Sequence, residues 1–322
     1  MIRLFSNTYT QTIFFLMAFA LLFRSSGLIE PYVNSNTPLT LNYLQDIFNV
    51  LNQNSVVAYF ISTFIVFITS LQFNKICNKH ELVIFPSFLP AYFYIVLNSV
   101  FVDQFYVGPV IFVNLFIILS LGSILDLYHS ENPYFSLFSA SFLAGISSLL
   151  NMTYVVFFLI VIIGVNIFRP FNFRENLSAF IGFLMPLYIG TMFNYLINGN
   201  FLPYYIFFPD YGNFNNQNWV LYSALPMIGV IGILAILRMN KNYNLNSIKQ
   251  RRSIFLMLIT LVASGILMVT GKQNPRQEFS FVAIPLAYFF SFYFTNSRFN
   301  LFKEIVNFLL LGLIIFFHYW EG

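Results

Sequence analysis

Long apolar stretches separated by short polar connections run along almost the whole chain. Stretches that could cross a bilayer cover residues 9–23, 55–72, 83–101, 108–127, 134–150, 152–168, 178–197, 219–237, 253–271, 279–296 and 304–319. A helix needs about 20 apolar residues to cross a hydrocarbon core of about 30 Å, and several of these stretches are shorter. The pattern predicts an all-α, polytopic transmembrane helical bundle of about eleven spans, within a range of nine to twelve.

The apolar runs favour helices over a transmembrane barrel. Hydrocarbon offers no hydrogen-bond partners to the backbone, so only helices and closed barrels can span it. Barrel strands alternate polar and apolar residues over roughly ten positions, whereas Val155–Ile167 and Phe308–Phe317 do not alternate. The spans leave no room for a soluble domain, so we expect residues 1–322 to form a single transmembrane helical domain.

The basic residues between these stretches fall in alternate loops. If the N-terminus is cytoplasmic, the inner side holds Arg3, Lys75, Lys79, Arg169, Arg174, Arg238, Lys241, Lys249, Arg251, Arg252, Arg298 and Lys303. The outer side holds only Arg24, Lys272 and Arg276. This asymmetry follows the positive-inside rule. It predicts a multi-pass protein of the bacterial inner membrane and favours two separate spans, not one kinked element, at 134–150 and 152–168.

Composition agrees with the membrane interpretation. Hydrophobic residues make up 58% of the chain and charged residues 8%, against about 25% charged residues in a soluble domain. The net charge of +4 follows the topology, so we expect no nucleic-acid partner. Cys77 is the only cysteine, which excludes an internal disulfide and a cysteine cluster for zinc.

The first outward segment, residues 24–54, contains a helical pattern of its own. Its apolar residues recur at helical spacing: Leu41, Leu44, Ile47, Phe48 and Leu51. Polar residues occupy the other faces. The segment therefore predicts an amphipathic helix that lies in the membrane interface.

Charged residues on the outward side are the first candidates for chemistry. Lys272 and Arg276 stand where basic residues are otherwise excluded, and together they could clamp a lipid phosphate, with Arg24 as a further substrate-binding residue. Glu30 and Asp103 could form an acid/base pair or hold a divalent metal such as Mg or Mn. The alternative for each of them is an ordinary solvated loop charge.

Aromatic residues dominate the outward segment 199–219. Tyr204 and Tyr205 could stack on sugar rings or cover a lipid-lined cleft. The alternative is a belt of aromatic side chains at head-group depth.

Several function classes lack the residues they need. The three histidines, His80, His129 and His318, are divided between the two sides of the predicted topology and cannot meet on one metal. The sequence contains no phosphate-binding Walker loop, no Gly-x-Ser-x-Gly and no His-Glu-x-x-His. Ionisable residues are scarce within the spans, which disfavours an ion-coupled carrier, although a carrier of a neutral solute or lipid could use buried asparagines.

The order of these features resembles the GT-C type of polytopic glycosyltransferase, which takes sugars from polyprenyl-phosphate carriers. The likeness rests on a first span followed by a long outward loop with an acid and an interfacial helix, and on Arg276-Gln-Glu-Phe-Ser-Phe-Val-Ala-Ile-Pro285. It implies that Glu30 is the first-loop acid, Asp103 the second acid, and Arg276 the residue that meets the carrier phosphate. In that superfamily the first-loop acid is commonly an Asp, often in an acidic pair, whereas Glu30 stands alone.

The chain also resembles an uncharacterised family of bacterial integral membrane proteins of about this length. Some members carry the label of carotene-cleaving monooxygenases, but those enzymes hold iron with four histidines and this chain has three. The hypothesis is therefore a membrane glycosyltransferase that uses a polyprenyl-phosphate-linked sugar on the outward face. The alternatives are a transporter or flippase of a lipid or neutral solute, and a non-catalytic membrane scaffold.

Overall fold

The structure is a computed structural model, and it describes residues 5, 9, 11–28, 42–83, 85–101, 104–130, 132–199, 229, 232–233, 247–270, 275–296 and 300–321. The described part is all-helical. Its α-helices are α2 (Gln11–Phe23), α3 (Asn42–Asn52), α4 (Ser55–Lys79), α5 (Leu89–Leu97), α6 (Pro109–Asp126), α7 (Pro133–Leu150), α8 (Val156–Phe168), α9 (Phe173–Asn198), α11 (Ile248–Thr270), α12 (Pro275–Asn296) and α13 (Asn300–Glu321). Short 3-10 helices are η1 (Ser25–Leu28), η3 (Leu127–His129) and η4 (Met152–Val155).

Each predicted stretch except 219–237, which lies mostly outside the described residues, overlaps a helix, although the stretch 83–101 contains only the nine-residue α5. Among the described residues, six helices are long and apolar enough to cross a membrane: α4, α6, α7, α9, α11 and α12. Shorter apolar helices are Gln11–Phe23, Met152–Phe168 and Asn307–Phe316. The chain is thus a helical membrane protein, and the predicted number of eleven spans is not confirmed.

Local sequence signals set the helix ends. The Asn54 side chain accepts a hydrogen bond from Val56 N at 3.1 Å and so caps α4, and Asn172 caps α9 in the same way. Pro109 and Pro133 open α6 and α7, where the missing N–H costs nothing. Gly199, with φ of 69°, ends α9 in the left-handed conformation that glycine adopts without strain.

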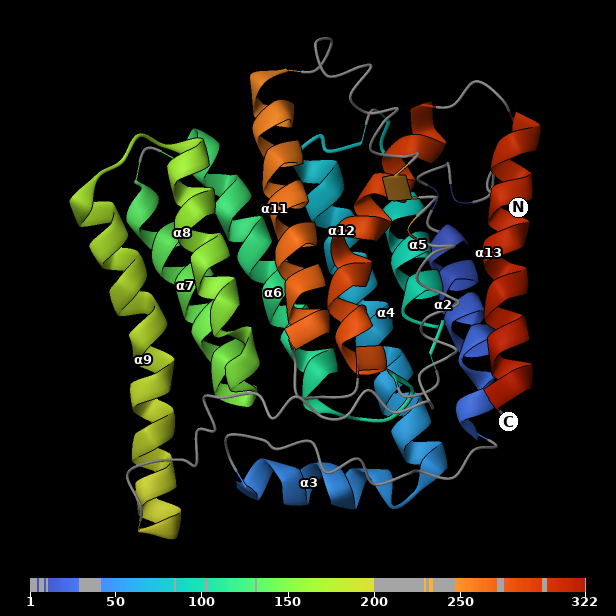
Figure 1. Ribbon diagram of the computed structural model, residues 1–322, viewed down its shortest axis with the longest axis horizontal. Coiled ribbons are helices and arrows are strands. Elements are labelled where there is room, and N and C mark those ends of the chain that lie inside the picture. The colour runs from blue at the N-terminus through green and yellow to red at the C-terminus, as the bar shows by residue number, and fades with distance from the viewer. Residues whose placement is uncertain are drawn as a thin grey trace.

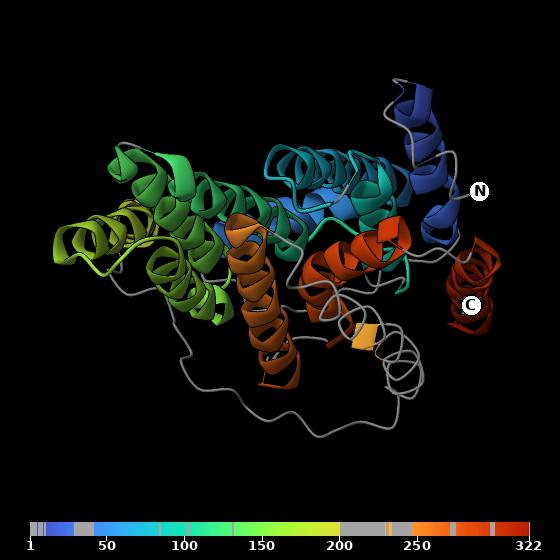
Figure 2. The ribbon, with the colours of Figure 1, turned by 90° about the horizontal axis from the view of Figure 1, so that it is seen from above.

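The helices run alongside one another, and α3 lies across one end of the bundle (Figure 1). Seen from above, α7, α8 and α9 lie at one edge, α2 and α13 at the other, and α12 between them (Figure 2). The apolar part of α12 is almost completely buried inside the protein, whereas that of α9 is mostly exposed. We therefore place α12 at the centre of the bundle and α9 at its periphery.

Small residues allow α7 and α9 to approach closely. A Cβ atom added at Gly145 would lie 2.6 Å from the carbonyl oxygen of Phe183, and one at Gly182 would lie 2.8 Å from that of Phe138. Transmembrane helices associate through such close backbone packing because lipid provides no hydrophobic force between them. The neighbouring α8 is a separate helix that returns antiparallel to α7, since Arg169 at its end donates to the carbonyl of Ser130, just before α7.

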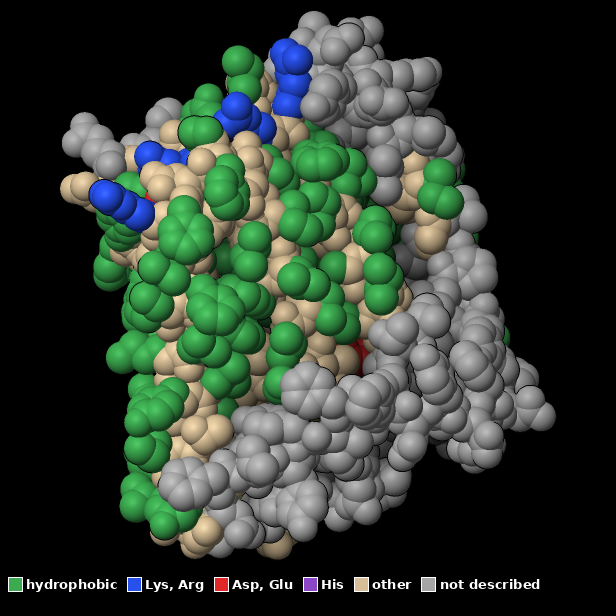
Figure 3. Space-filling model, turned by 60° about the vertical axis from the view of Figure 1, so that its left-hand side comes forward, with side chains coloured by type: hydrophobic (Ala, Val, Ile, Leu, Met, Phe, Trp, Pro, Cys, Tyr) green, Lys and Arg blue, Asp and Glu red, His purple; other side chains and the backbone are tan. Residues whose placement is uncertain are grey.

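Basic side chains gather at one end of the bundle, which we call the basic end: Lys79, Arg169, Arg174, Lys249, Arg251 and Arg252 (Figure 3). Contacts between distant segments place these helix ends together. Lys79 Nζ lies 2.5 Å from Asp126 Oδ1, Gln250 donates to the carbonyl of Glu81, and Arg252 donates to that of Phe168. The segregation of basic residues predicted from the sequence is therefore present among these residues.

Candidate functional site

The opposite end of the bundle, where α2 ends and α12 begins, contains a buried arginine. Arg24 directly follows α2, and its side chain has no exposed surface. Its guanidinium donates four hydrogen bonds, to Thr63 Oγ1 (3.2 Å), Ser62 Oγ (3.3 Å) and the carbonyl oxygens of Asn98 (3.1 Å) and Gln104 (2.5 Å). It also lies over the ring of Phe105, 4.6 Å from the centroid. Arg24 therefore joins α2 to α4 and to the α5–α6 connection.

The partners of Arg24 are dipoles and an aromatic ring. Among the described residues, no carboxylate forms an ion pair with it. Burial lowers the pKa of Arg24 to about 9, against the opposing influence of Tyr59 and Tyr94. The guanidinium thus remains protonated at neutral pH, and this end of the protein holds a buried positive charge.

Gln104 connects Arg24 to Arg276. Its carbonyl accepts from Arg24, and its side-chain Nε2 donates to the carbonyl of Arg276 at 2.9 Å. Arg276 lies in the first turn of α12, and its side chain is half-buried. Arg24 and the backbone of Arg276 thus belong to one hydrogen-bonded unit.

A second group of polar side chains continues inward from this unit. Ser280 Oγ donates to Asn98 Oδ1 at 2.7 Å and accepts a hydrogen bond from Asn114 Nδ2. The carbonyl of the same Asn98 accepts from Arg24. Buried amides and a hydroxyl therefore link α5, α6 and α12 in the interior of the bundle.

An acidic residue lies buried on another face of α12. Glu278 has no exposed surface, and its Oε2 accepts a hydrogen bond from the hydroxyl of Tyr154, in η4, at 2.8 Å. Within the described part of the chain, Glu278 forms no ion pair, and its Oε1 has no hydrogen-bond partner. An ionisable residue in this setting is expensive to bury, so it marks a candidate functional position.

An apolar groove of about 280 Å³ lies between α2 and α4. It is lined by Met17, Ala20, Leu21, Phe60, Ile61, Thr63, Phe64 and Phe67. Thr63, its one polar lining residue, is also a hydrogen-bond partner of Arg24. Thr63 therefore borders both the groove and the buried cation.

Comparison with protein families matches residues 35–321 to a family described as "Family of unknown function (DUF6427)". The chain belongs to the DUF6427 family. Neither the curated proteins nor the solved structures compared with it give a match. The expected resemblance to uncharacterised integral membrane proteins is thus supported by the family, and nothing in the comparisons supports the likeness to GT-C enzymes.

The DUF6427 match begins after Arg24 and Glu30 and includes the α12 residues Arg276 and Glu278. Of the predicted site residues, Glu30, Asp103, Lys272, Tyr204 and Tyr205 lie outside the described residues. The expected carboxylate pair and its metal therefore stay predictions. Among the described residues, no three His, Cys, Asp or Glu side chains come together as a metal site.

In this DUF6427 protein, residues close in sequence to Glu30 and Asp103 make contacts with one another and with α12. Gly27, three residues before Glu30, is so close to Phe105 that an added Cβ would lie 2.9 Å from the phenylalanine Cβ. Phe101, two residues before Asp103, packs edge-to-face against Phe279 at 5.2 Å. The segment that follows α2 and the α5–α6 connection therefore meet beside the start of α12.

The burial of Arg24 and the Glu278–Tyr154 pair are not apparent from the sequence analysis. The sequence predicts Arg24 in an outward loop, whereas its side chain turns into the bundle and donates four hydrogen bonds to protein acceptors. Glu278 lies just before the predicted stretch 279–296, so the hydrophobic pattern alone leaves it outside a span. Pro275 followed by an acid in the first turn is, however, a helix-start signal, and it could have placed Glu278 inside α12.

Proposed function

We propose that this protein is a GT-C-like membrane glycosyltransferase that uses a polyprenyl-phosphate-linked sugar at the end of the bundle that contains Arg24 and Arg276. We further propose that this end faces outward from the bacterial inner membrane and that the N-terminus is cytoplasmic. The observation that carries the proposal is the Arg24–Gln104–Arg276 unit. It ties the buried cation of Arg24 to the backbone of Arg276 at the end opposite the basic end, where the positive-inside rule leaves few cations.

A lipid-linked phosphate suits this arrangement chemically. Arginine binds phosphate through a planar fork of donors. In the proposed complex Arg276, with Lys272, contacts the phosphate. Arg24 donates its hydrogen bonds to protein oxygens, so in the proposed complex it contributes only its positive charge to the phosphate site. Its bonds also hold α4 and the end of α5 in place. The apolar groove beside Thr63 offers a place for the start of the isoprenoid chain.

The reaction needs a base as well as a phosphate clamp. The acceptor hydroxyl bonds to the anomeric carbon of the sugar and gives its proton to a carboxylate. The bond between the anomeric carbon and the phosphate oxygen breaks, and the polyprenyl phosphate leaves with the electron pair. Glu30 is the proposed base with Asp103 as its partner, and both carboxylates are suitable oxygen ligands for Mg or Mn. Tyr204 and Tyr205 are the proposed sugar-stacking residues.

The test is deletion of the gene in its own bacterium, followed by analysis of surface glycans and polyprenyl-phosphate-linked sugars. The proposal expects a missing sugar on the glycan and accumulation of the lipid-linked donor. Glu30→Gln and Arg276→Ala should fail to restore the sugar at normal protein levels in the membrane. Lys75→Gln, which removes an exposed charge of α4 one turn before Lys79 of the basic end, should restore it. Full complementation by both site variants would end the proposal.

A carrier of a lipid or neutral solute is the second candidate, because the Asn98–Ser280–Asn114 chain places amide and hydroxyl groups inside the bundle. For a carrier we expect the buried polar residues, and not Arg276, to be essential for function. Ser280→Ala and Asn114→Ala would abolish translocation, whereas Arg276→Ala would retain it, and lipid-linked sugars would be unchanged in the deletion strain.

A further inference from the structure

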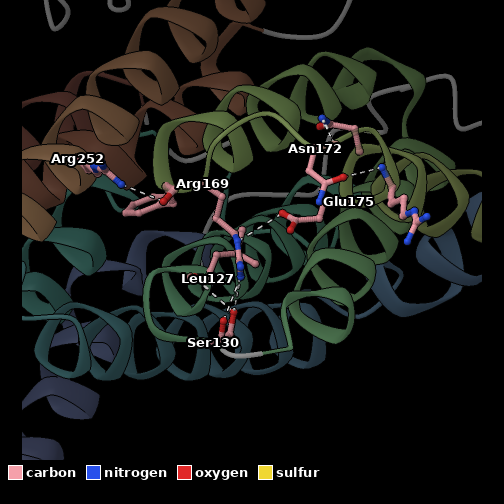
Figure 4. A network of polar contacts seen from close by, with 9 residues as sticks. Leu127, Ser130, Arg169, Asn172, Glu175 and Arg252 are labelled. Carbon is pink, nitrogen blue, oxygen red and sulfur yellow. Dashed lines mark hydrogen bonds and ion pairs between the residues drawn. The ribbon is translucent and has the colours of Figure 1, made fainter.

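Two glutamates are buried in the described part of the chain, and their surroundings differ. Glu175 is 7% exposed and lies in the first turn of α9 at the basic end. Arg169 is turned toward it, with its Nε 3.4 Å from Glu175 Oε2 (Figure 4). Because a cation lies within ion-pair distance, the negative charge of a carboxylate at Glu175 is compensated where it is buried.

Glu278 has no such compensation. It accepts a hydrogen bond from the hydroxyl of Tyr154, and among the described residues no cation forms an ion pair with it. This includes Arg276, which precedes it by two residues, and the buried Arg24. The helices that pack on α12 bring no further charge to it. Their ionisable residues on this side of the basic end are Tyr92 and Tyr94 of α5, whereas residues 109–125 of α6, 156–168 of α8 and 253–270 of α11 contain none.

A bound proton would remove the charge that Glu278 otherwise brings into the bundle. A carboxylate without a countercharge is costly to bury, because the surroundings no longer solvate it as water does. Proton binding converts the carboxylate into a neutral carboxylic acid. Oε2 then keeps the hydrogen bond from Tyr154, and the proton resides on Oε1, the oxygen without a hydrogen-bond partner. The surroundings of Glu278 therefore suit the neutral acid.

We propose that Glu278 is a reversible proton-binding site and that it exchanges its proton at the end of the bundle that contains Arg276. Arg276 is half-buried and belongs to the same helical turn, so the carboxyl group lies near the accessible surface along α12. A proton-coupled carrier requires an ionisable group of this kind inside a span, and the hydrophobic pattern of the sequence does not show one. The proton site does not depend on the transferase function.

Infrared difference spectroscopy of the full chain, in a detergent without ester groups, tests this proposal. A neutral carboxylic acid has a C=O stretching band at higher frequency than the bands of a carboxylate. The original protein minus Glu278→Gln should show one neutral-acid band at about pH 6, where a solvated glutamate has already lost its proton. The band should disappear at about pH 9 and return when the pH is lowered again.

Tyr154→Phe identifies the band without changing Glu278. Loss of the hydrogen bond from the tyrosine hydroxyl should move the C=O band to higher frequency, because a carbonyl that accepts no hydrogen bond has a stiffer C=O bond. This comparison also serves if Glu278→Gln does not fold. A band at the same frequency in Tyr154→Phe would show that the acid observed is not Glu278.

Glu175→Gln is the matched control, because it removes the other buried glutamate, which has Arg169 as its countercharge. Its difference spectrum at about pH 6 should contain carboxylate bands and no neutral-acid band. Carboxylate bands for Glu278 at the same pH would overturn the proposal. A neutral-acid band that persists at about pH 9 would overturn it as well, since the proton would then not be exchanged. Size-exclusion profiles establish that each variant is folded.

Discussion

Tyr154 donates a hydrogen bond of 2.8 Å to Glu278 and so ties η4, between α7 and α8, to the first turn of α12. The two residues are 124 positions apart in sequence, and both are completely buried. Phe281, one turn beyond Glu278, packs edge-to-face against the same tyrosine ring. This contact fixes the central helix relative to the α7–α8 hairpin.

We predict that Tyr154 and Glu278 are energetically coupled. Tyr154→Phe removes the donor and leaves Glu278 without its partner, at an expected cost of about 1–3 kcal/mol. Glu278→Met strands the tyrosine hydroxyl at a similar cost. Because removing both partners avoids an orphaned polar group, the double variant should be about 1–3 kcal/mol more stable than the sum of the single effects.

A double-mutant cycle of unfolding free energies in mixed micelles measures this coupling. Tyr134→Phe, at an exposed tyrosine near the basic end, is the control and should change stability by less than about 0.5 kcal/mol. Additive effects of Tyr154→Phe and Glu278→Met would show that the hydrogen bond contributes nothing specific.

Arg24 is predicted to be essential for stability. Arg24→Met leaves two hydroxyl groups and two carbonyl oxygens without their common donor, so we expect a loss of about 3 kcal/mol or more. Arg24→Lys retains the charge but cannot reach acceptors on α4 and on both sides of the α5–α6 connection, so it should rescue only part of the loss. Thermal unfolding of the purified variants gives the order. A lysine variant as stable as the original protein would contradict the bonding role.

Hydrophobic stretches and basic residues allow the positions of the helices to be predicted, because both patterns arise from the membrane as solvent. The stretch at 178–197 lies within α9, which begins earlier, at Phe173, and that at 108–127 coincides with α6 within one residue at each end. Depth is harder to predict from one sequence. The α12 stretch looks no more hydrophobic than its neighbours, yet it is the most enclosed of the candidate spans.

The candidate site was predictable only in part, because the sequence pattern shows where a span ends but not how deeply each side chain is buried. Exclusion of basic residues from one side singled out Arg24 and Arg276, and the two prove to be joined through Gln104. Periodicity does not show which way a residue at the end of a span turns, so the burial of Arg24 could not be read from the sequence. The contact of Tyr154 with Glu278 depends on the packing of α12 against η4, which leaves no local signal.

Close packing of α7 on α9 gives a third prediction. Gly145→Val places its side chain against the carbonyl of Phe183 and should destabilise the protein by about 1–3 kcal/mol through overpacking. Gly265→Ala in α11 is the matched control, since an added Cβ there meets nothing within 4 Å. It should be neutral or stabilise by up to about 1 kcal/mol through helix propensity. Similar melting temperatures for the two variants would contradict tight α7–α9 packing.

The two ends of the bundle should be accessible from opposite sides of the membrane. In a Cys77→Ala background, Arg174→Cys lies at the basic end and Gln53→Cys between α3 and α4, and both positions are exposed. A membrane-impermeant maleimide added to intact spheroplasts should label Gln53→Cys alone, and inside-out vesicles should reverse the result. Cys77 in the original chain is buried and should react from neither side. Labelling of Arg174→Cys in intact spheroplasts would invert the topology and place the Arg24–Arg276 end in the cytoplasm, where a donor sugar carried on the outer leaflet could not reach it.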